Sequence, residues 1–167
     1  MFLHPIQELA HHQKRDGFSC GVEALDDYLR KRASQDVRRK IAVAYVQLED
    51  DGKTIAGYYT LASTSLDIGE LPSDLIKKLP KYPRVPAILI GRLARDERHK
   101  GQGLGEHLLM DSLRRSYENS KRIAAAAVVV EADNEQTKSF YEKYGFVQLP
   151  DNPHKLFIMI STIAKLI

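Results

Sequence analysis

Apolar and polar residues alternate along this chain in stretches that have either helix or strand period. Between residues 21 and 40 the apolar positions fall at helical spacing and predict an amphipathic helix. Its buried face is expected to hold Val22, Leu25, Tyr28, Leu29 and Ala33. Residues 41–49 and 53–68 have strand character and are joined by the turn Asp50–Gly52, so the pattern predicts a β-hairpin.

The second half of the chain continues with strands and helices in alternation. Residues 87–94 form a mostly apolar run, which is typical of a central strand buried on both faces. Residues 103–118 carry leucines at helical spacing and predict a helix. Residues 123–132 predict another strand, and a further helix is predicted between the cap residue Asn134 and the stop at Gly145.

Two remaining segments complete the order of elements. Residues 71–86 contain four prolines and predict a surface connection with a short helical turn at 73–78. Residues 155–167 predict a last strand. The order favours an α/β fold, with an antiparallel N-terminal part and a parallel strand–helix–strand unit in the middle of a mixed sheet flanked by helices. We expect a single domain over residues 1–167.

Composition limits the class of protein. The chain has 167 residues, of which 43% are hydrophobic and 28% charged, as in ordinary soluble domains. One cysteine excludes a disulfide within the chain and fits a reducing compartment. No apolar run approaches the ~20 residues that span a bilayer, and the N-terminal residues lack the pattern of a signal peptide. We therefore expect a cytoplasmic protein that does not bind membranes.

Charge is unevenly distributed, although the net charge is only +3. The segment Arg30–Lys40 carries six basic residues and one acidic residue. Such a segment is suited to neutralising phosphates, and it is equally typical of a solvated helix face. The sequence alone leaves both interpretations open.

Three glycines, at positions 101, 103 and 105, stand where a helix should begin. A glycine-rich turn between a strand and a helix exposes backbone N–H groups, which bind phosphate together with the helix N-terminus. Lys100 adds a positive charge beside them. The spacing fits neither the dinucleotide fingerprint nor the P-loop, and a purely structural turn is the alternative.

Two motifs resemble the GNAT superfamily of acyl-CoA N-acetyltransferases. "KGQGLG" at residues 100–105 resembles the pyrophosphate loop of that family, [RQ]-x-x-G-x-[GA]. "NEQTKSFYEKYGF" at residues 134–146 resembles its closing segment. Lys100 replaces the usual Arg or Gln and Thr137 replaces the usual Ala. The resemblance implies a GNAT fold with splayed parallel central strands, and acetyl-CoA as cosubstrate without a metal.

A narrower resemblance, over about Phe18–Leu149, is to the GNAT toxins of type II toxin–antitoxin pairs. It is carried by "FSCGVEALDDYL", "AGYYTLAS" and "ILIGRLARDERHKGQGLGEHLL". It implies acetylation of the α-amine of aminoacyl-tRNA, which blocks translation, and also a homodimer and a ribbon-helix-helix antitoxin. The basic segment then becomes a surface for the tRNA acceptor arm. The residues expected there are Arg30, Arg38, Arg39 and Lys40.

The resemblance also implies which residues hold acetyl-CoA. The backbone of Leu93, Ala94 and Arg95 is expected to pair with the pantetheine arm, at a bulge near Leu93–Ala94. Asn134 is expected to cap its helix, to touch the pantetheine, or both. The residues expected to grip the diphosphate are Lys100, Gly101, Gln102, Gly103, Leu104 and Gly105.

Tyr141 is the candidate catalytic residue, because the family uses a tyrosine at this motif position. A phenol, with an ordinary pKa of ~10, is suited to protonating a leaving thiolate. The aromatic residues around Tyr141, including Tyr144, are expected to be core. Arg92 lies in an apolar strand and is expected either to bind a substrate phosphate or to pair with a carboxylate. Cys20 is expected to pack as a small apolar group.

Two other functions stay open at this stage. One is a GNAT enzyme that acetylates a small amine or a protein N-terminus. The other is a non-catalytic module that binds acetyl-CoA as a ligand.

Overall fold

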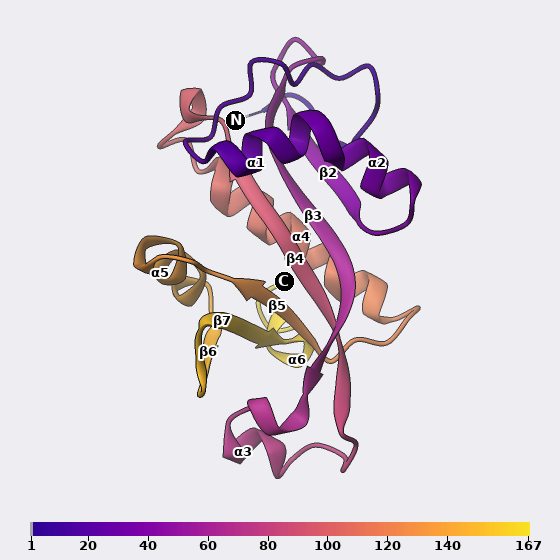
Figure 1. Ribbon diagram of the computed structural model, residues 1–167, viewed down its shortest axis with the longest axis vertical. Coiled ribbons are helices and arrows are strands. Elements are labelled where there is room, and N and C mark those ends of the chain that lie inside the picture. The colour runs from indigo at the N-terminus through magenta and orange to yellow at the C-terminus, as the bar shows by residue number, and fades with distance from the viewer. Residues whose placement is uncertain (1) are drawn as a thin grey trace. The chain divides into compact units, whose positions relative to one another are not determined.

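The computed structural model describes residues 2–167 (Figure 1). The chain forms two compact units. Unit 1 comprises the residues up to Ala62 together with Ile90–Ser112, and unit 2 comprises Ser63–Leu89 and Leu113–Ile167. Strands β3 (Ile55–Asp67) and β4 (Arg84–Arg95) and helix α4 (Leu104–Ser120) contribute residues to both units. The expectation of one domain over residues 1–167 stays a prediction.

The strands of unit 1 follow the order β1-β2-β3-β4, with β1 at Gln7–Glu8 and β2 at Val43–Leu48. β2 is antiparallel to both β1 and β3, which confirms the predicted hairpin. Asp51 fixes its turn, because Oδ1 accepts hydrogen bonds from the backbone N–H groups of Lys53 (2.8 Å) and Thr54 (2.9 Å). The Thr54 hydroxyl also donates to the Asp51 carboxylate. This third bond has the largest effect, and together with the two backbone bonds it lowers the pKa of the Asp51 carboxyl to about 2.

The predicted helix over residues 21–40 is present, but it is not a continuous α-helix. It consists of α1 (Glu23–Asp27), the π-helical turn η1 (Tyr28–Arg32) and α2 (Ala33–Arg38). The Ala33 N–H bonds to the Tyr28 carbonyl, five residues back. Val22 does not lie on the buried face: it is the N-cap and its side chain is 51% exposed.

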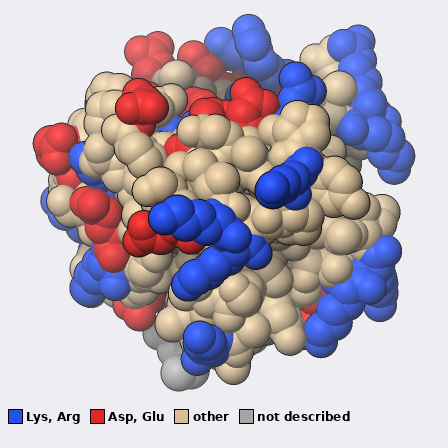
Figure 2. All heavy atoms as spheres, turned by 90° about the horizontal axis from the view of Figure 1, so that it is seen from below, with Lys and Arg blue, Asp and Glu red and all other residues tan. Residues whose placement is uncertain are grey.

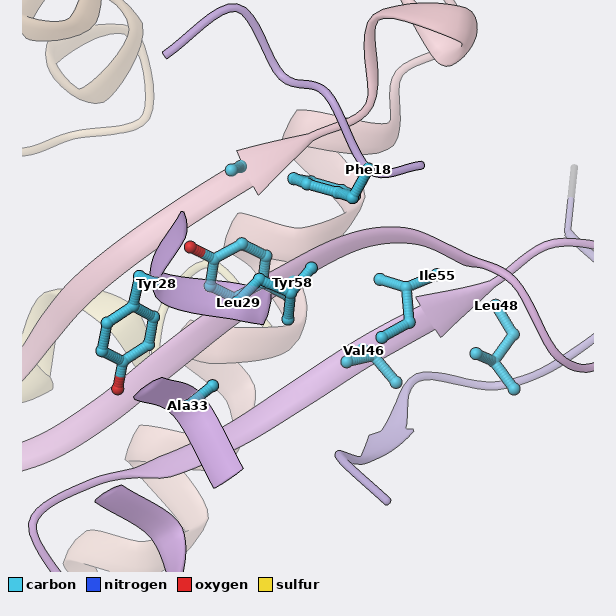
Figure 3. Packing of buried hydrophobic residues seen from close by; sticks show 9 residues of the cluster. Phe18, Tyr28, Leu29, Ala33, Val46, Leu48, Ile55 and Tyr58 are labelled. Atoms are coloured by element: carbon cyan, nitrogen blue, oxygen red, sulfur yellow. The ribbon is translucent and has the colours of Figure 1, made fainter. Parts of the chain in front are cut away.

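Two apolar clusters fill opposite faces of the unit 1 strands. Tyr28, Leu29 and Ala33 pack on one face with residues of β2 and β3, as Figure 3 shows. On the other face, Leu104 and Leu108 of α4 pack against a cluster that includes Tyr59. The α1–α2 segment and the beginning of α4 therefore lie on different sides of these strands (Figure 1).

Unit 2 carries the rest of the sheet, in the order β3-β4-β5-β7-β6. Its strands β5 (Ala127–Glu131) and β6 (Val147–Leu149) are both antiparallel to β7 (Asn152–Met159). The helices α3 (Ser73–Ile76), α5 (Glu135–Lys143) and α6 (Ile160–Ile163) and the 3₁₀ turn η2 (Ile68–Glu70) complete the unit. The predicted turn at 73–78 and helix after Asn134 are thereby confirmed.

Two strands of unit 2 are shorter at their ends than the sequence predicted. The last strand stops at Met159 and is followed by α6, because Ile160 and Ile163 are spaced for a helix and Ile163 is fully buried. The strand predicted at 123–132 is confined to Ala127–Glu131, and Ile123 is 75% exposed. The short strand β6, which pairs with β7, was not predicted at all.

The elements confirm the predicted α/β class with an antiparallel N-terminal part. β4 and β5 are neighbours in the sheet and are connected through α4, the long connection that parallel neighbours require. None of the helices in residues 2–167 has the length and apolar character needed to cross a membrane.

Candidate functional site

The glycine loop connects the 3₁₀ turn η3 (Glu97–His99) to α4. Gly101 has φ +79° and Gly103 has φ +75°, a left-handed conformation that side chains disfavour. A Cβ placed on either glycine would meet no atom within 4 Å. The glycines are therefore required by the backbone, and the space beside them is open to a ligand.

The N-terminus of α4 presents backbone donors at the end of this loop. The first intrahelical bond runs from the His107 N–H to the Gly103 carbonyl (3.0 Å), so the N–H groups of Leu104, Gly105 and Glu106 have no acceptor within the helix. The Leu104 side chain is buried and anchors the helix. The free N–H groups and the positive end of the helix dipole form a site for an anion such as a diphosphate.

Asp96, which the sequence analysis did not select, fixes the beginning of the loop. Its carboxylate is buried and accepts hydrogen bonds from the backbone N–H groups of Ser19 (3.1 Å) and Arg98 (2.9 Å) and from the Arg98 guanidinium. Burial alone would raise the pKa of Asp96, but the bonds from Arg98 and Ser19 outweigh it and hold the pKa below its ordinary value. Asp96 thereby ties the "FSCG" segment to the glycine loop.

His99 supports the loop from the other side. Its Nε2 lies 2.7 Å from Glu49 Oε2, and its Nδ1 lies 3.2 Å from the side-chain oxygen of Gln102. Glu49 also binds the Arg98 guanidinium at 3.0 Å. Both ring nitrogens of His99 are therefore engaged by neighbouring side chains. His99 is thus a support for Gln102 and not a free base.

The end of β4 carries the segment expected to bind pantetheine. Leu93 and Arg95 are half-buried, and the Ala94 side chain is buried in the cluster of Figure 3. The Asp96 N–H bonds to the Ala56 carbonyl at 2.8 Å, which holds the strand against β3. The predicted bulge near Leu93–Ala94 stays a prediction.

Asn134 and Tyr141 belong to unit 2. The Asn134 side chain accepts a hydrogen bond from the Thr137 N–H at 2.8 Å, which confirms it as the N-cap of α5. The predicted stop is also confirmed: Gly145 has φ +100°, and the Phe146 N–H bonds to the Tyr141 carbonyl at 3.3 Å. These two caps fix the helix that carries Tyr141.

The Tyr141 side chain is 5% exposed. Its ring makes edge-to-face contacts with Phe140 and Phe146, each with 5.3 Å between ring centroids. Its hydroxyl has no hydrogen-bond partner among residues 2–167, and burial raises the pKa of the phenol well above its ordinary value. Tyr141 is therefore a neutral donor on a largely buried side chain, and its hydroxyl has no acceptor among residues 2–167. Tyr144, expected in the core, is only half-buried.

The basic segment divides into engaged and exposed residues. Arg30 is half-buried and donates to the Phe18 carbonyl (2.8 Å) and to Asp27 (3.3 Å), so it also has a structural role. Arg38, Arg39 and Lys40 are exposed at the end of α2. Lys40 has φ +62° and is the one non-glycine residue with positive φ in the described chain, residues 2–167.

Arg92 contacts an aromatic ring, which neither of its two predicted roles anticipated, and its predicted phosphate role stays a prediction. Its Cζ lies 3.5 Å from the centroid of the Tyr28 ring, a cation–π contact. No carboxylate of residues 2–167 lies within ion-pair distance of it, so the predicted pairing with a carboxylate was wrong.

Cys20 packs as expected. It is half-buried against the cluster that contains Tyr58, and burial, together with a bond to Asp26, raises the pKa of its thiol to about 11. A thiol with this pKa is a poor nucleophile at neutral pH. Within residues 2–167 no group of three His, Cys, Asp or Glu side chains is arranged to hold a metal ion.

Comparison with known proteins places this geometry in a family. The model of the acetyltransferase (GNAT) domain matches residues 41–148. A probable toxin TacT of Sinorhizobium fredii is 33% identical over 171 aligned positions, covering 98% of this chain and 93% of the relative. A tRNA-acetylating toxin of Mycobacterium tuberculosis is 34% identical over 150 positions, covering 90% and 88%.

Solved structures agree. AtaT in complex with acetyl-methionyl-tRNAfMet superposes with a TM-score of 0.90 at 31% identity, covering 97% of this chain and 98% of AtaT. AtaTR bound with AcCoA superposes with a TM-score of 0.85 at 31% identity, covering 97% and 96%. The predicted fold is confirmed, and the chain belongs to the GNAT family of acetyltransferases.

Proposed function

We propose that this protein transfers the acetyl group of acetyl-CoA to the α-amine of an aminoacyl-tRNA and so blocks translation. One observation carries the proposal: the chain matches, over nearly its whole length, a toxin that was solved with acetyl-methionyl-tRNAfMet. An acetylated aminoacyl-tRNA is the product that such a transfer would give. The tRNA-acetylating toxin among its relatives supports the same reaction.

The glycine loop supports acetyl-CoA as the donor. The open space at Gly101 and Gly103 and the N–H groups that begin α4 suit the diphosphate of coenzyme A, and Lys100 adds positive charge. β5 has five residues and β4 has twelve, so β5 is too short to pair along the whole of β4. We assign the backbone of Leu93–Arg95 to the pantetheine arm on this basis.

In the reaction, the neutral α-amine attacks the thioester carbonyl, a C–N bond forms and the C–S bond breaks. We assign Tyr141 as the acid that protonates the departing sulfur. Its side chain is largely buried, its hydroxyl has no acceptor among residues 2–167, and the raised pKa keeps the proton on the oxygen at physiological pH. The proton of the amine leaves to water, because the site offers no other base within the assigned residues, and water returns a proton to the Tyr141 phenolate.

For the acceptor we assign the exposed cations at the end of α2, Arg38, Arg39 and Lys40, together with Arg30 of η1. The net charge of +3 is too small to attract RNA over the whole surface. Figure 2 shows one face on which Lys and Arg side chains stand in separate groups, with Asp and Glu side chains on part of the same face. Attraction to the tRNA is therefore expected to be local.

The direct test offers radiolabelled acetyl-CoA with charged tRNA, with free amino acids and with peptides that have a free N-terminus. We expect label only in charged tRNA, and loss of the label when the ester bond is hydrolysed. Label in amines or peptides alone would establish the alternative enzyme. Binding of acetyl-CoA by calorimetry without transfer to any acceptor would establish the non-catalytic module.

We also propose that the protein is a cytoplasmic homodimer restrained by an antitoxin with a ribbon-helix-helix domain. Structures of AtaT bound to the C-terminus of the antitoxin AtaR, and of that complex on DNA, support such a partner. Light scattering checks the dimer. Co-expression with the product of the adjacent gene, followed by co-purification and relief of growth arrest, checks the antitoxin.

A further inference from the structure

Arg92 is a cation of unit 1 that has no anionic partner among residues 2–167. Its side chain is half-buried, and the contact that the structure gives it is the face of Tyr28. A guanidinium has five N–H donors, and removing them from water without acceptors is costly. The guanidinium carbon lies over the ring, and its N–H donors have no acceptor among residues 2–167.

The Tyr28 ring is itself held in place. Its hydroxyl donates to Asp36 Oδ2 at 2.8 Å, and burial, with this bond, raises the pKa of the phenol to about 12. The ring therefore stays neutral and fixed under the guanidinium. Figure 3 shows Tyr28 at the border of the apolar cluster, with its hydroxyl directed away from the other labelled side chains. Arg92 is thus pre-positioned before any ligand arrives.

The pair connects the two functional segments of unit 1. Arg92 immediately precedes Leu93–Arg95, and Tyr28 begins the π-helical turn that continues into the basic segment. Because side chains alternate along a strand, Arg92 lies on the same face as Ala94, which packs in the cluster under α1 and α2. Arg92 therefore projects from the strand assigned to the pantetheine arm toward the helical segment that carries the basic residues.

A planar guanidinium held by stacking is suited to bidentate recognition of a phosphate. We propose that Arg92 binds the phosphodiester next to the terminal adenosine, at the single-stranded 3′ end of the aminoacyl-tRNA. Arg92 is then the residue that aligns the aminoacyl ester with the thioester, and Tyr28 is the residue that positions it. This inference rests on the proposed acetylation of aminoacyl-tRNA.

Two minimal acceptors test it: the aminoacyl ester of adenosine, which has no phosphate, and that of the dinucleotide CpA, which has one phosphodiester. We expect the wild-type protein to have a KM for the CpA ester lower by about tenfold or more, the value of a charge-assisted hydrogen bond. In Arg92→Gln this preference should vanish. The KM for acetyl-CoA should change little, because Arg92 is assigned to the acceptor.

Two further variants complete the experiment. Arg92→Lys keeps the charge but not the planar fork, so it should retain only part of the preference. Arg84→Gln, the same change on an exposed residue of the same strand, should retain all of it. Thermal unfolding checks that each variant is folded.

The proposal is overturned if the wild-type protein uses both esters equally, or if Arg92→Gln impairs both to the same extent. In the second case Arg92 would act on the aminoacyl group or on the fold. If the wild-type protein acetylates neither charged tRNA nor either ester, the proposed function itself has failed, and the two failures are distinguished.

Discussion

At the scale of single residues, Lys40 combines a charge assigned to tRNA binding with a backbone conformation that destabilises the fold. Lys40 lies two residues after the last residue of α2, in the left-handed region, and the Ile41 N–H bonds back to the Asp36 carbonyl at 2.9 Å. Glycine usually fills this position in such a helix end. A lysine is strained in this conformation, so Lys40 lowers the free energy of unfolding relative to a glycine at the same position.

Lys40→Gly should therefore stabilise the protein. Relief of the left-handed strain of ~1–2 kcal/mol exceeds the added entropy of the unfolded chain, ~0.4–1 kcal/mol, so unfolding in urea should show a gain of ~0.5–1 kcal/mol. Affinity for tRNA should fall. Arg39→Gly is the matched control, because Arg39 has φ −83° and should only lose stability. A destabilised Lys40→Gly variant would contradict this account.

Tyr141→Phe should abolish most of the transfer while leaving the fold intact. Removing the hydroxyl removes the acid but keeps the ring contacts with Phe140 and Phe146, so we expect kcat to fall by about 10²–10⁴. The KM for acetyl-CoA and the melting temperature should hardly change. Tyr144→Phe is the control and should retain activity. Full activity of Tyr141→Phe would remove Tyr141 from the mechanism.

At the scale of elements, the glycine loop is shaped by its connections on both sides. Asp96 joins it to Ser19, and His99 joins Gln102 to Glu49. The loop conformation is thus set by residues outside the glycine motif. Substitutions in the loop should therefore change the affinity for acetyl-CoA more than they change the free energy of unfolding.

Gly103→Ala should weaken acetyl-CoA binding more than it weakens the fold. The added methyl enters open space in the protein, so unfolding should register only the backbone strain, ~1–2 kcal/mol. The methyl would occupy the space assigned to the diphosphate, and we expect the KM for acetyl-CoA to rise tenfold or more. Gly69→Ala also enters open space, at an ordinary φ, and should change neither quantity. An unchanged KM in Gly103→Ala would place the diphosphate elsewhere.

Asp96→Asn should destabilise the protein at neutral pH by ~2–3 kcal/mol, because buried donors lose a charged acceptor. The folded pKa of Asp96 lies below the ordinary value of 3.8, so its contribution is complete above pH 3.8 and is lost as the pH falls through the folded pKa. Urea unfolding should show the full difference in the free energy of unfolding between wild type and variant at pH 7 and pH 5. This difference should become smaller towards pH 3. Asp67→Asn, an exposed control, should have little effect.

At the scale of the whole molecule, the assigned residues come from both units: the glycine loop and basic segment from unit 1, Asn134 and Tyr141 from unit 2. The positive charge is concentrated in the basic segment Arg30–Lys40. A net charge of +3 gives little general attraction for RNA, so binding depends on a few exposed cations.

Replacing Arg38, Arg39 and Lys40 together with Gln should reduce the salt dependence of tRNA binding. Each phosphate contact contributes a slope of ~0.7–0.9 in the logarithm of affinity against the logarithm of salt, so the slope should fall by about 2–3. Filter binding over a range of salt concentrations measures it. Replacing the exposed Lys77, Lys78 and Lys81 removes the same charge from unit 2 and should leave the slope unchanged. Equal losses in both triple variants would mean that the attraction is not local.

The sequence by itself determined the features that depend on neighbouring residues. The hairpin turn after Asp50, the caps of α5 at Asn134 and Gly145 and the left-handed glycines of the loop are all local, because each is fixed by hydrogen bonds or steric limits within a few residues. The motifs around these features also sufficed to identify the family. Periodicity located the core face of α4, since its leucines repeat within one helix.

Only the tertiary structure decided how distant residues meet. Arg92 stacks on Tyr28, Asp96 holds Ser19 and His99 binds Glu49, and in each case the partners lie far apart in the sequence. The π turn at Tyr28–Arg32 and the end of β7 were also decided there, because burial against other elements outweighs local preference. A sequence pattern specifies which groups are available, whereas the packing of elements selects which of them become partners.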